Sequence, residues 1–534
     1  MHSTSIPVAK ASFLSRIVKD YLAEAHCLQG FYKYSPNIGS ISQVIADKQQ
    51  QPLDRKILVR VLEEQYLSIG AGEQVLTNIR SITDGNTFTV TTAHQPNIFT
   101  GYLFFIYKIV ATIHTCRQLA KQYPQYHFVP VYWMGSEDHD FEEISQINLY
   151  GEKLQWEHAH GGPVGRLDLD GFKEMIAHIS AKLGSLPYAE EAVSLLHHAY
   201  QEGLTLGTAT RRLVNELFGK YGVVIIDQDD AQLKQIFAKV LADEVLNSRV
   251  SGLVQGTIDE INRCQYKIQA TPREINVFYL GNNSRERITW EEHKKQFQVL
   301  NSPTAFDTEA MEQDILAHPE NYSPNVFLRP LYQETVLPNV AYIGGGGEVA
   351  YWLEQKAVFD HYQVNYPMLL LRPSIFLVDK QVAKKMEKLE MDFPQLMEEE
   401  EELIKGYVKK HSAQDLALTK EKQATAALFD SILVKASAID PTLEKAVEGQ
   451  KQAMLNSLEA LETKLLRAEK RNFETATNQI KSIRSKLLPD NQPQERYDNF
   501  LPWYAAFGPQ FLDEVIAACD PFANAVMFLQ EDTQ

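Results

Sequence analysis

Apolar residues in the first 380 positions follow two alternating patterns, one typical of buried strands and one typical of helices packed on a core. Short β-branched or apolar runs occupy 87–92, 128–134 and 223–227. Apolar residues at helical spacing fill 98–120, and a second helical pattern covers 205–221. Continuous apolar strands that alternate with helices are typical of a parallel sheet covered on both faces. The pattern therefore predicts an α/β fold with a Rossmann-like parallel-sheet core.

The region from about 150 to 330 contains segments that this sheet does not accommodate, and we expect them to be helical insertions. Four glycines at 344–347 precede a helical pattern at 348–361, and the apolar run 368–371 has the character of another core strand. The Rossmann-like core is therefore expected to extend over 1–380.

Past residue 380 the apolar residues fall at heptad spacing, separated by Glu, Lys, Gln and Asn. Seams of this kind run through 389–407, 454–468 and 476–487, which predicts a long antiparallel α-helical coiled coil over 381–488. A lone hairpin would leave part of the seam exposed, so we expect a homodimer held through it. The last segment, 489–534, is broken by prolines and rich in aromatic residues, and should pack back on the core.

The overall composition narrows the function. The formal net charge is −17, and so acidic a chain is a poor general ligand for nucleic acid or for an anionic membrane surface. No window holds the ~20 apolar residues that a membrane span needs, and the N-terminus has no apolar signal segment. Neither a CxxC pair nor the Cys/His spacing of a zinc site occurs. We therefore expect reduced thiols in a cytoplasmic protein at Cys27, Cys116, Cys264 and Cys519.

A polar block follows the first predicted strand. His94, Gln95 and Asn97 stand where strand gives way to helix, and Gly101 comes shortly after. Open α/β sheets bind ligands at the carboxyl ends of their strands, and helix N-termini present N–H groups to phosphate or carboxylate. His94 can add a further donor, and Gly101 permits close backbone approach. A simple helix cap made by Pro96 and Asn97 is the alternative, but it leaves His94 and Gln95 unexplained.

A second polar block, Glu137-Asp138-His139-Asp140, follows the apolar run at 128–134. Carboxylates can bind a substrate amine, and a histidine exchanges protons near neutral pH. The same residue types bind metal ions, but neighbouring residues of a strand point to opposite faces and cannot all converge on one ion. A solvated loop is the alternative. Four consecutive ionisable residues after a buried strand favour a functional role.

Further candidates for a binding site lie later in the chain. The glycine run before Glu348 and Tyr351 has the form of an anion-binding turn, although it matches neither GxGxxG nor a P-loop, and a flexible turn explains it equally well. Arg329 and Arg372 lie in apolar stretches, where an unpaired charge is costly, and could bind a carboxylate or phosphate. A structural salt bridge is the alternative for both. These features add as substrate-binding candidates Arg329, Gly345, Gly346, Gly347, Glu348, Tyr351 and Arg372.

The chain resembles the family of cysteine-adding enzymes of bacillithiol biosynthesis in three segments, TTAHQPNIFTGYLFFIYKIVATI, VPVYWMGSEDHDFEEI and GGGGEVAYWLEQK. The order of core, insertions, coiled coil and return segment is similar as well, so the resemblance covers nearly the whole chain. It implies a dimer formed through the coiled coil and a ligase that joins L-cysteine to glucosaminyl malate in the last step of bacillithiol biosynthesis. The family is distantly similar to ligases that activate carboxylates as adenylates, but Asn97 stands in place of the second histidine of their HxGH-type motif.

The resemblance also implies a bound adenine nucleotide, ATP or ADP, near the return segment. The matching residues are Tyr150, Gly151, Lys384, Gln494, Arg496, Tyr497, Asn499 and Trp503. At the reaction centre we expect His94 to bind phosphate or carboxylate, and Asp138 and His139 to bind and deprotonate the attacking amine. The glycine run would lie along the bound sugar or nucleotide, and substrate would also be bound by Gln95, Asn97, Gly101, Glu137 and Asp140.

Two other functions fit parts of the sequence. A metal-dependent hydrolase could use the block at 137–140, and chelators would then abolish its activity. A non-catalytic coiled-coil scaffold would account for the C-terminal helices. A scaffold has no use for polar clusters at strand ends, however, so the sequence favours an enzyme.

Overall fold

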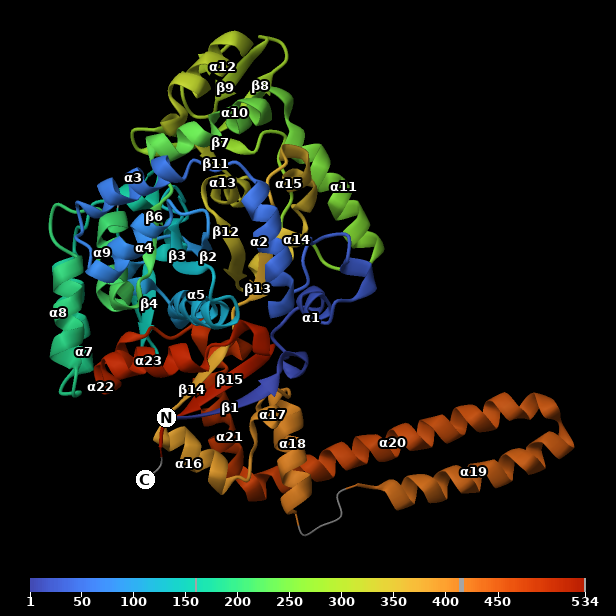
Figure 1. Cartoon of the computed structure of the whole chain (residues 1–534). Coiled ribbons are helices and arrows are strands. Elements are labelled where there is room, and N and C mark those ends of the chain that lie inside the picture. The colour runs from blue at the N-terminus through green and yellow to red at the C-terminus, as the bar shows by residue number, and fades with distance from the viewer. Residues whose placement is uncertain (159–160, 413–416, 533–534) are drawn as a thin grey trace. The chain divides into compact units, whose positions relative to one another are not determined.

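The computed structural model, drawn in Figure 1, describes residues 1–158, 161–412 and 417–532. The chain divides into two compact units. The first combines Met1–Leu377 with Gln492–Gln530, and the second consists mainly of Val378–Asn491. The return segment thus belongs to the same unit as the core of the fold.

A five-stranded parallel sheet forms the centre of the first unit (Figure 1). The strand order is β13-β12-β2-β3-β6, and every neighbouring pair is parallel. Nearly all residues of these strands are buried, which explains why the sequence shows uninterrupted apolar runs rather than alternation. The predicted Rossmann-like core is confirmed by the strands β2 (Thr87–His94), β3 (His127–Met134), β6 (Val224–Asp227), β12 (Asn339–Gly344) and β13 (Met368–Leu371).

The strand order reverses in the middle of this sheet. From β2 the chain proceeds outward to β3 and β6, whereas β12 and β13 extend from the other side of β2. Helix α5 (Leu103–Gln122) connects β2 to β3 and packs against both strands. In open parallel sheets, a ligand-binding crevice forms at the carboxyl ends of the strands where the order reverses. The topology therefore predicts a ligand-binding site at the carboxyl ends of β2 and β12.

Helices and both chain ends complete the first unit. The helices before the sheet are α1 (Arg16–Leu22), α2 (Ile41–Gln50), α3 (Arg55–Tyr66) and α4 (Glu73–Ser81). Between β3 and β6 lie α7 (Phe172–Leu183), α8 (Ala189–Ala199) and α9 (Leu206–Phe218). The return segment packs α22 (Leu501–Phe507) on α8 and α23 (Pro509–Ala518) on α5. Its last strand, β15 (Ala525–Gln530), pairs antiparallel with the N-terminal β1 (His2–Pro7).

The insertion between β6 and β12 forms a second sheet, in the upper part of Figure 1. Its strands have the order β10-β9-β8-β7-β11, and all pairs are antiparallel. They are β7 (Val277–Gly281), β8 (Ser284–Glu291), β9 (Gln296–Val299), β10 (Ala305–Phe306) and β11 (Tyr322–Pro324). The accompanying helices are α10 (Ala231–Asn247), α11 (Arg249–Arg263), α12 (Thr308–Ala317) and α13 (Arg329–Val336), the last of which leads into β12.

A tight turn delays the helix expected over 98–120, so that α5 begins only after residue 102. Three consecutive residues from Phe99 to Gly101 have positive φ, with 66° at Gly101. A Cβ at Gly101 would lie 2.7 Å from Nδ2 of Asn97, so both the backbone and the space favour glycine. The Asn499 side chain donates hydrogen bonds to the carbonyls of Phe99 and Gly101. The return segment thus holds the turn that follows β2.

The second unit is helical, and its two longest helices, α19 (Thr419–Ile439) and α20 (Glu444–Lys470), form an antiparallel hairpin (Figure 1). The predicted coiled coil is confirmed there. The single seam expected over 389–407 is wrong, because Glu390 has a positive φ and Asp392 caps a new short helix. Separate helices cover this region: α16 (Lys380–Lys388), α17 (Phe393–Leu396) and α18 (Glu400–His411), with α21 (Glu474–Leu487) closing the unit.

The cysteines differ from the expectation of four reduced thiols. Cys27 and Cys264 form a disulfide, whereas Cys116 and Cys519 are free and buried. The two bonded residues are 237 positions apart, so their pairing depends on tertiary structure and leaves no spacing signal in the sequence. No helix of the described residues is long and apolar enough to cross a membrane.

Candidate active site

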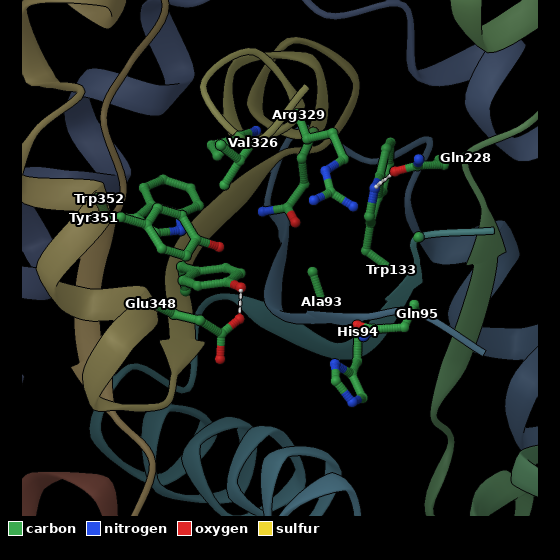
Figure 2. A pocket seen from close by; sticks show the side chains of 14 residues that line it. Ala93, His94, Gln95, Trp133, Gln228, Val326, Arg329, Glu348, Tyr351 and Trp352 are labelled. Carbon is green, nitrogen blue, oxygen red and sulfur yellow. Dashed lines mark hydrogen bonds between the residues drawn. The ribbon is translucent and has the colours of Figure 1, made fainter. Parts of the chain in front are cut away.

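A cavity lies at the carboxyl ends of β2, β3 and β12, where the strand order reverses (Figure 2). It has a volume of about 490 Å³, its open mouth included. Strand ends, α13 and α14 (Gly346–Leu353) supply its walls. The lining residues are Ala93, His94, Gln95, Trp133, Gly135, Gln228, Val326, Arg329, Pro330, Gln333, Tyr342, Glu348, Tyr351 and Trp352. This is the place where open parallel sheets bind small ligands.

His94 brings a buried imidazole to the edge of the cavity. Phe104 and Phe105 of α5 pack against the ring, with centroid distances of 5.3 and 5.5 Å. Burial lowers the pKa of His94 well below its ordinary value, and the nearby charge of Lys108 adds to the shift, so the ring is neutral at neutral pH. The Nε2 atom is buried and has no hydrogen-bond partner within the described chain. A neutral, unpartnered imidazole nitrogen can accept a proton or a ligand hydrogen bond.

Lys108 lies beneath the cavity and links two of its walls. Its Nζ donates to the carbonyl of Ala93 at 2.7 Å and pairs with Oε2 of Glu348 at 2.7 Å. Glu348 also accepts hydrogen bonds from the Tyr342 hydroxyl at 2.7 Å and from the Gly345 amide at 2.8 Å. Burial lowers the pKa of Lys108, and the Glu348 carboxylate opposes that shift. These contacts fix the Glu348 carboxylate across the point where the strand order reverses.

Arg329 provides a cation on another wall, and Figure 2 shows it and Glu348 on different sides of the cavity. Its Nη1 lies 3.0 Å from Oδ2 of Asp138. Burial alone would raise the pKa of Asp138, but Arg329 and Arg285 hold it below its ordinary value, so Asp138 stays ionised. A Cβ at Gly135 would lie 3.4 Å from Nη1 of Arg329, so glycine leaves room for the guanidinium. Two ion pairs, Arg329–Asp138 and Lys108–Glu348, therefore adjoin the cavity, and Arg329 and Glu348 are the members that line it.

The four residues of the block at 137–140 do not share one location. Glu137 is fully buried, forms an ion pair with Lys234 and does not line the cavity. Asp138 contacts the cavity through Arg329. His139 and Asp140 are exposed, and neither is among the residues that line the cavity. The side chains diverge because successive residues at a strand end point in different directions.

Arg372 is occupied by an internal salt bridge. Its Nη1 and Nη2 lie 2.8 and 2.7 Å from the two carboxylate oxygens of Glu495, and both side chains are buried. The glycine run caps and begins α14, with Gly345 at the cap and Gly346 and Gly347 in the first turn. Arg372 and the three glycines are not among the residues that line the cavity, so they support the cavity from outside.

The remaining substrate-binding candidates divide into two groups. Gln95 and Tyr351 line the cavity, as do Arg329 and Glu348. Asn97 and Gly101 instead form the turn before α5, and the Asn97 side chain is buried. The turn therefore positions β2 and α5 relative to each other, rather than contributing side chains to the cavity wall.

Two of the residues expected at a nucleotide are committed to the fold. Gln494 is buried and accepts a hydrogen bond from the Leu377 amide at 2.9 Å, and Asn499 holds the turn before α5. Lys384 is an exposed residue of α16 in the second unit. These two buried amides stabilise the return segment.

The other residues expected at a nucleotide are accessible. Tyr150 is 60% exposed and forms, with Gly151, the turn between β4 (Gln146–Leu149) and β5 (Glu152–Gln155). Asn148 donates to the Tyr497 carbonyl at 3.0 Å, so this hairpin lies beside the return segment. Arg496 is exposed, and Tyr497 and Trp503 are half-buried. Aromatic faces and a free guanidinium fit an adenine base and phosphates.

An aromatic wall of the cavity has no counterpart in the sequence analysis. The rings of Tyr342 and Trp352 stack with a centroid distance of 4.4 Å, and the indole of Trp133 donates to Gln228 at 2.9 Å. These residues lie in apolar strand and helix runs, where they are indistinguishable from core residues. Lys108 was missed for the same reason, because it interrupts the apolar pattern of α5 at a single position.

A search for groups of three or more His, Cys, Asp or Glu side chains that could hold a metal ion finds none within the described ranges. The block at 137–140 illustrates why, since its four side chains diverge. The metal-dependent hydrolase considered from the sequence gains no support from this geometry.

Comparisons with known proteins agree with the fold. Residues 1–373 match the family model described as "Bacillithiol biosynthesis BshC, N-terminal Rossmann-like domain", and residues 375–530 match the corresponding C-terminal coiled-coil domain. Proteins named "Putative cysteine ligase BshC" from Flavobacterium johnsoniae and Flavobacterium psychrophilum are each 38% identical, over 98% of this chain and of their own length. A protein of the same name from Christiangramia forsetii is 37% identical over the same shares. The chain therefore belongs to the BshC family of bacillithiol biosynthesis.

Proposed function

We propose that the chain is a ligase that forms an amide between the carboxyl group of L-cysteine and the amine of glucosaminyl malate, the last step of bacillithiol biosynthesis. The observation that carries the proposal is the cavity at the strand-order reversal, with Arg329 and Glu348 on different walls. A guanidinium binds a carboxylate, and a fixed carboxylate binds an ammonium group. The names of the relatives point to the same chemistry.

His94 is our candidate for the group that accepts the proton of the attacking amine. The new C–N bond requires the amine to lose a proton and the carboxyl carbon to lose an oxygen. His94 lines the cavity and its ring is neutral, so a ring nitrogen has a lone pair for that proton. Asp138 would act as a positioning residue, because it holds the guanidinium of Arg329.

A nucleotide is part of the proposal because a free carboxylate is a poor acyl donor at neutral pH. Bound ATP would attach a phosphoryl or adenylyl group to one carboxyl oxygen, and that oxygen would then leave with phosphate or AMP when the amine attacks the carbon. Tyr497 and Trp503 offer aromatic faces to the adenine, and the exposed Arg496 offers a guanidinium to the phosphates. We place the reaction in the cytoplasm.

Incubation of the purified full-length chain with cysteine, glucosaminyl malate and ATP, followed by mass spectrometry, tests this function. We expect a species with the combined mass of the two substrates less one water, because an amide bond expels the elements of water. Its formation should stop when ATP is left out and resume when ATP is restored. Absence of the product from the complete mixture would refute the proposed reaction, and equal product without ATP would refute the nucleotide requirement.

We also propose that the protein is a homodimer held by the α19–α20 hairpin. None of the described residues of α19 is buried, and the hairpin exposes large apolar side chains. Exposed apolar surface of this extent is typical of an interface that a second copy covers. The most exposed of these side chains are Leu428 at 58%, Val434 at 72% and Ile439 at 81%.

Lysine at these positions should separate the dimer. We expect the wild type to show the mass of a dimer in light scattering, and the double variant Leu428→Lys/Val434→Lys to show that of a monomer, because charge at an apolar interface is costly. Leu67→Lys is the matched control, because Leu67 is 86% exposed but lies in the first unit. A folded double variant that keeps the dimer mass, or a monomeric wild type, would contradict this proposal.

A further inference from the structure

Three arginines gather on one face of the inserted sheet. In the β7–β8 pair, Phe278 is opposite Arg287 and Leu280 is opposite Arg285. Side chains alternate along a strand, so Phe278, Arg285 and Arg287 belong to the same face. Arg273, from the segment before β7, joins them, because its guanidinium lies 5.6 Å from the centroid of the Phe278 ring. We call Arg273, Arg285 and Arg287 the arginine cluster.

Phe278 organises the cluster. The Arg285 guanidinium lies 3.9 Å from the centroid of the same ring that Arg273 contacts. Two cations over one aromatic ring are each favoured by the quadrupole of the ring, although they repel one another. The arrangement thus holds like charges close together on a rigid support.

Contacts of Arg285 connect the cluster to one wall of the cavity. Arg285 donates to Nδ1 of His139 at 2.9 Å and to Oγ of Ser323 at 3.0 Å. The residue before His139 is Asp138, which binds Arg329, and Arg329 lines the cavity. A row of guanidinium groups therefore leads from the exposed Arg273 to the cavity wall.

The charge of the cluster is only partly balanced by the protein. Within the described residues, no carboxylate forms an ion pair with any of its three arginines, and the Asp138 carboxylate near Arg285 is paired with Arg329. Burial lowers the pKa of Arg285 to about 10. The Asp138 carboxylate opposes this shift, and repulsion from Arg329 and Arg273 adds to it. Adjacent unpaired cations cost free energy, which an anion recovers when it binds. A group of three neighbouring arginines without ion-pair partners is unexpected in a chain of net charge −17, and binding of an anionic ligand would explain it.

We propose that the arginine cluster is an anion site next to the Arg329 wall of the cavity, which binds a small dianion through paired guanidinium–oxygen contacts. A small ligand suits the cluster better than a nucleic acid, because the rest of the acidic chain repels a polyanion. The assignment rests on the proposed function, which provides two sources of such a group. One is the dicarboxylate of the malyl part of the acceptor, and the other is the phosphate chain of the nucleotide.

Calorimetric titration of the full-length chain at low ionic strength tests the site, with malate and pyrophosphate as separate probes. Arg273→Gln and Arg287→Gln are the test variants, because both side chains are exposed and their loss should leave the fold intact. Each variant should weaken binding about tenfold, since a charge-assisted contact is lost. Weaker malate binding identifies the dicarboxylate as the natural ligand, and weaker pyrophosphate binding identifies the phosphate.

Arg80→Gln is the matched control, because it removes the same charge from an exposed arginine that Glu63 already neutralises. The control should bind both probes as the wild type does. The site is refuted if the wild type binds neither probe, if neither test variant changes an affinity, or if the control weakens binding as much. Binding is measured without turnover, so the test of the anion site does not depend on ligase activity. A ligase that is active but binds neither probe would refute only the anion site. A protein that binds the probes but forms no amide would refute only the proposed reaction.

Discussion

Replacing His94 with alanine is expected to lower the rate of amide formation by ~10²–10⁴-fold, the usual loss when a group that accepts a proton is removed. The effect should appear mainly in kcat, because the imidazole would act on the amine during bond formation rather than in binding. Asp138→Asn should lose a similar factor in kcat/KM, since Arg329 would no longer be held by an ionised carboxylate. Product formation measured by mass spectrometry over a range of substrate concentrations gives kcat and KM for each variant. These values distinguish a loss confined to kcat from a loss in kcat/KM.

Melting temperatures decide whether these losses concern chemistry or folding. Both variants should melt near the wild type, since the nearby cavity can admit water to the altered site. His361→Ala is the matched control, because His361 is exposed and does not belong to the described cavity lining. Near-normal turnover in both variants would remove the cavity from the mechanism, and a much earlier melt would make the two residues structural.

Breaking the buried pair of Arg372 and Glu495 should produce the largest loss of stability. The two side chains are only 4% and 2% exposed, and Ser374 adds a hydrogen bond to Glu495 at 3.1 Å. Glu495→Ala leaves a buried guanidinium without its partner, which typically costs ~3–5 kcal/mol in the free energy of unfolding. Urea denaturation followed by tryptophan fluorescence measures the change.

The double variant Arg372→Met/Glu495→Met is the sharper comparison. Removing both charges avoids the unpaired guanidinium, so the double variant should be more stable than Glu495→Ala. Asp360→Ala, which breaks an exposed pair with Lys356, should cost less than ~1 kcal/mol and serves as the control. A Glu495→Ala protein as stable as this control would show that the pair does not hold the return segment to the core.

The sequence indicated the core because its strands are buried on both sides. Uninterrupted apolar runs as short as 128–134 and 368–371 are typical of strands covered on both faces, and both runs are strands of the parallel sheet. The parallel order then placed His94 at the carboxyl edge of that sheet. The apolar pattern of each strand and the parallel order of the strands were sufficient to predict the sheet and the place of His94.

Features that depend on side-chain direction or on distant contacts could not be predicted in this way. Lys108 sits in the apolar pattern of α5, and only the fold brings it to Glu348. The sequence favoured ligand binding and a salt bridge equally for Arg372, and the choice between them depends on Glu495, 123 residues away. The pairing of Cys27 with Cys264 likewise requires the tertiary structure.

The central claim is that this chain joins the carboxyl group of cysteine to an amine. Its most direct test compares cysteine with cysteamine, which has the same thiol and amine but lacks the carboxyl group, in reactions that contain glucosaminyl malate and ATP. We expect mass spectrometry to find a product with cysteine, at the combined mass less one water, and none with cysteamine. No product with cysteine, or a condensation product with cysteamine at a similar rate, would contradict it.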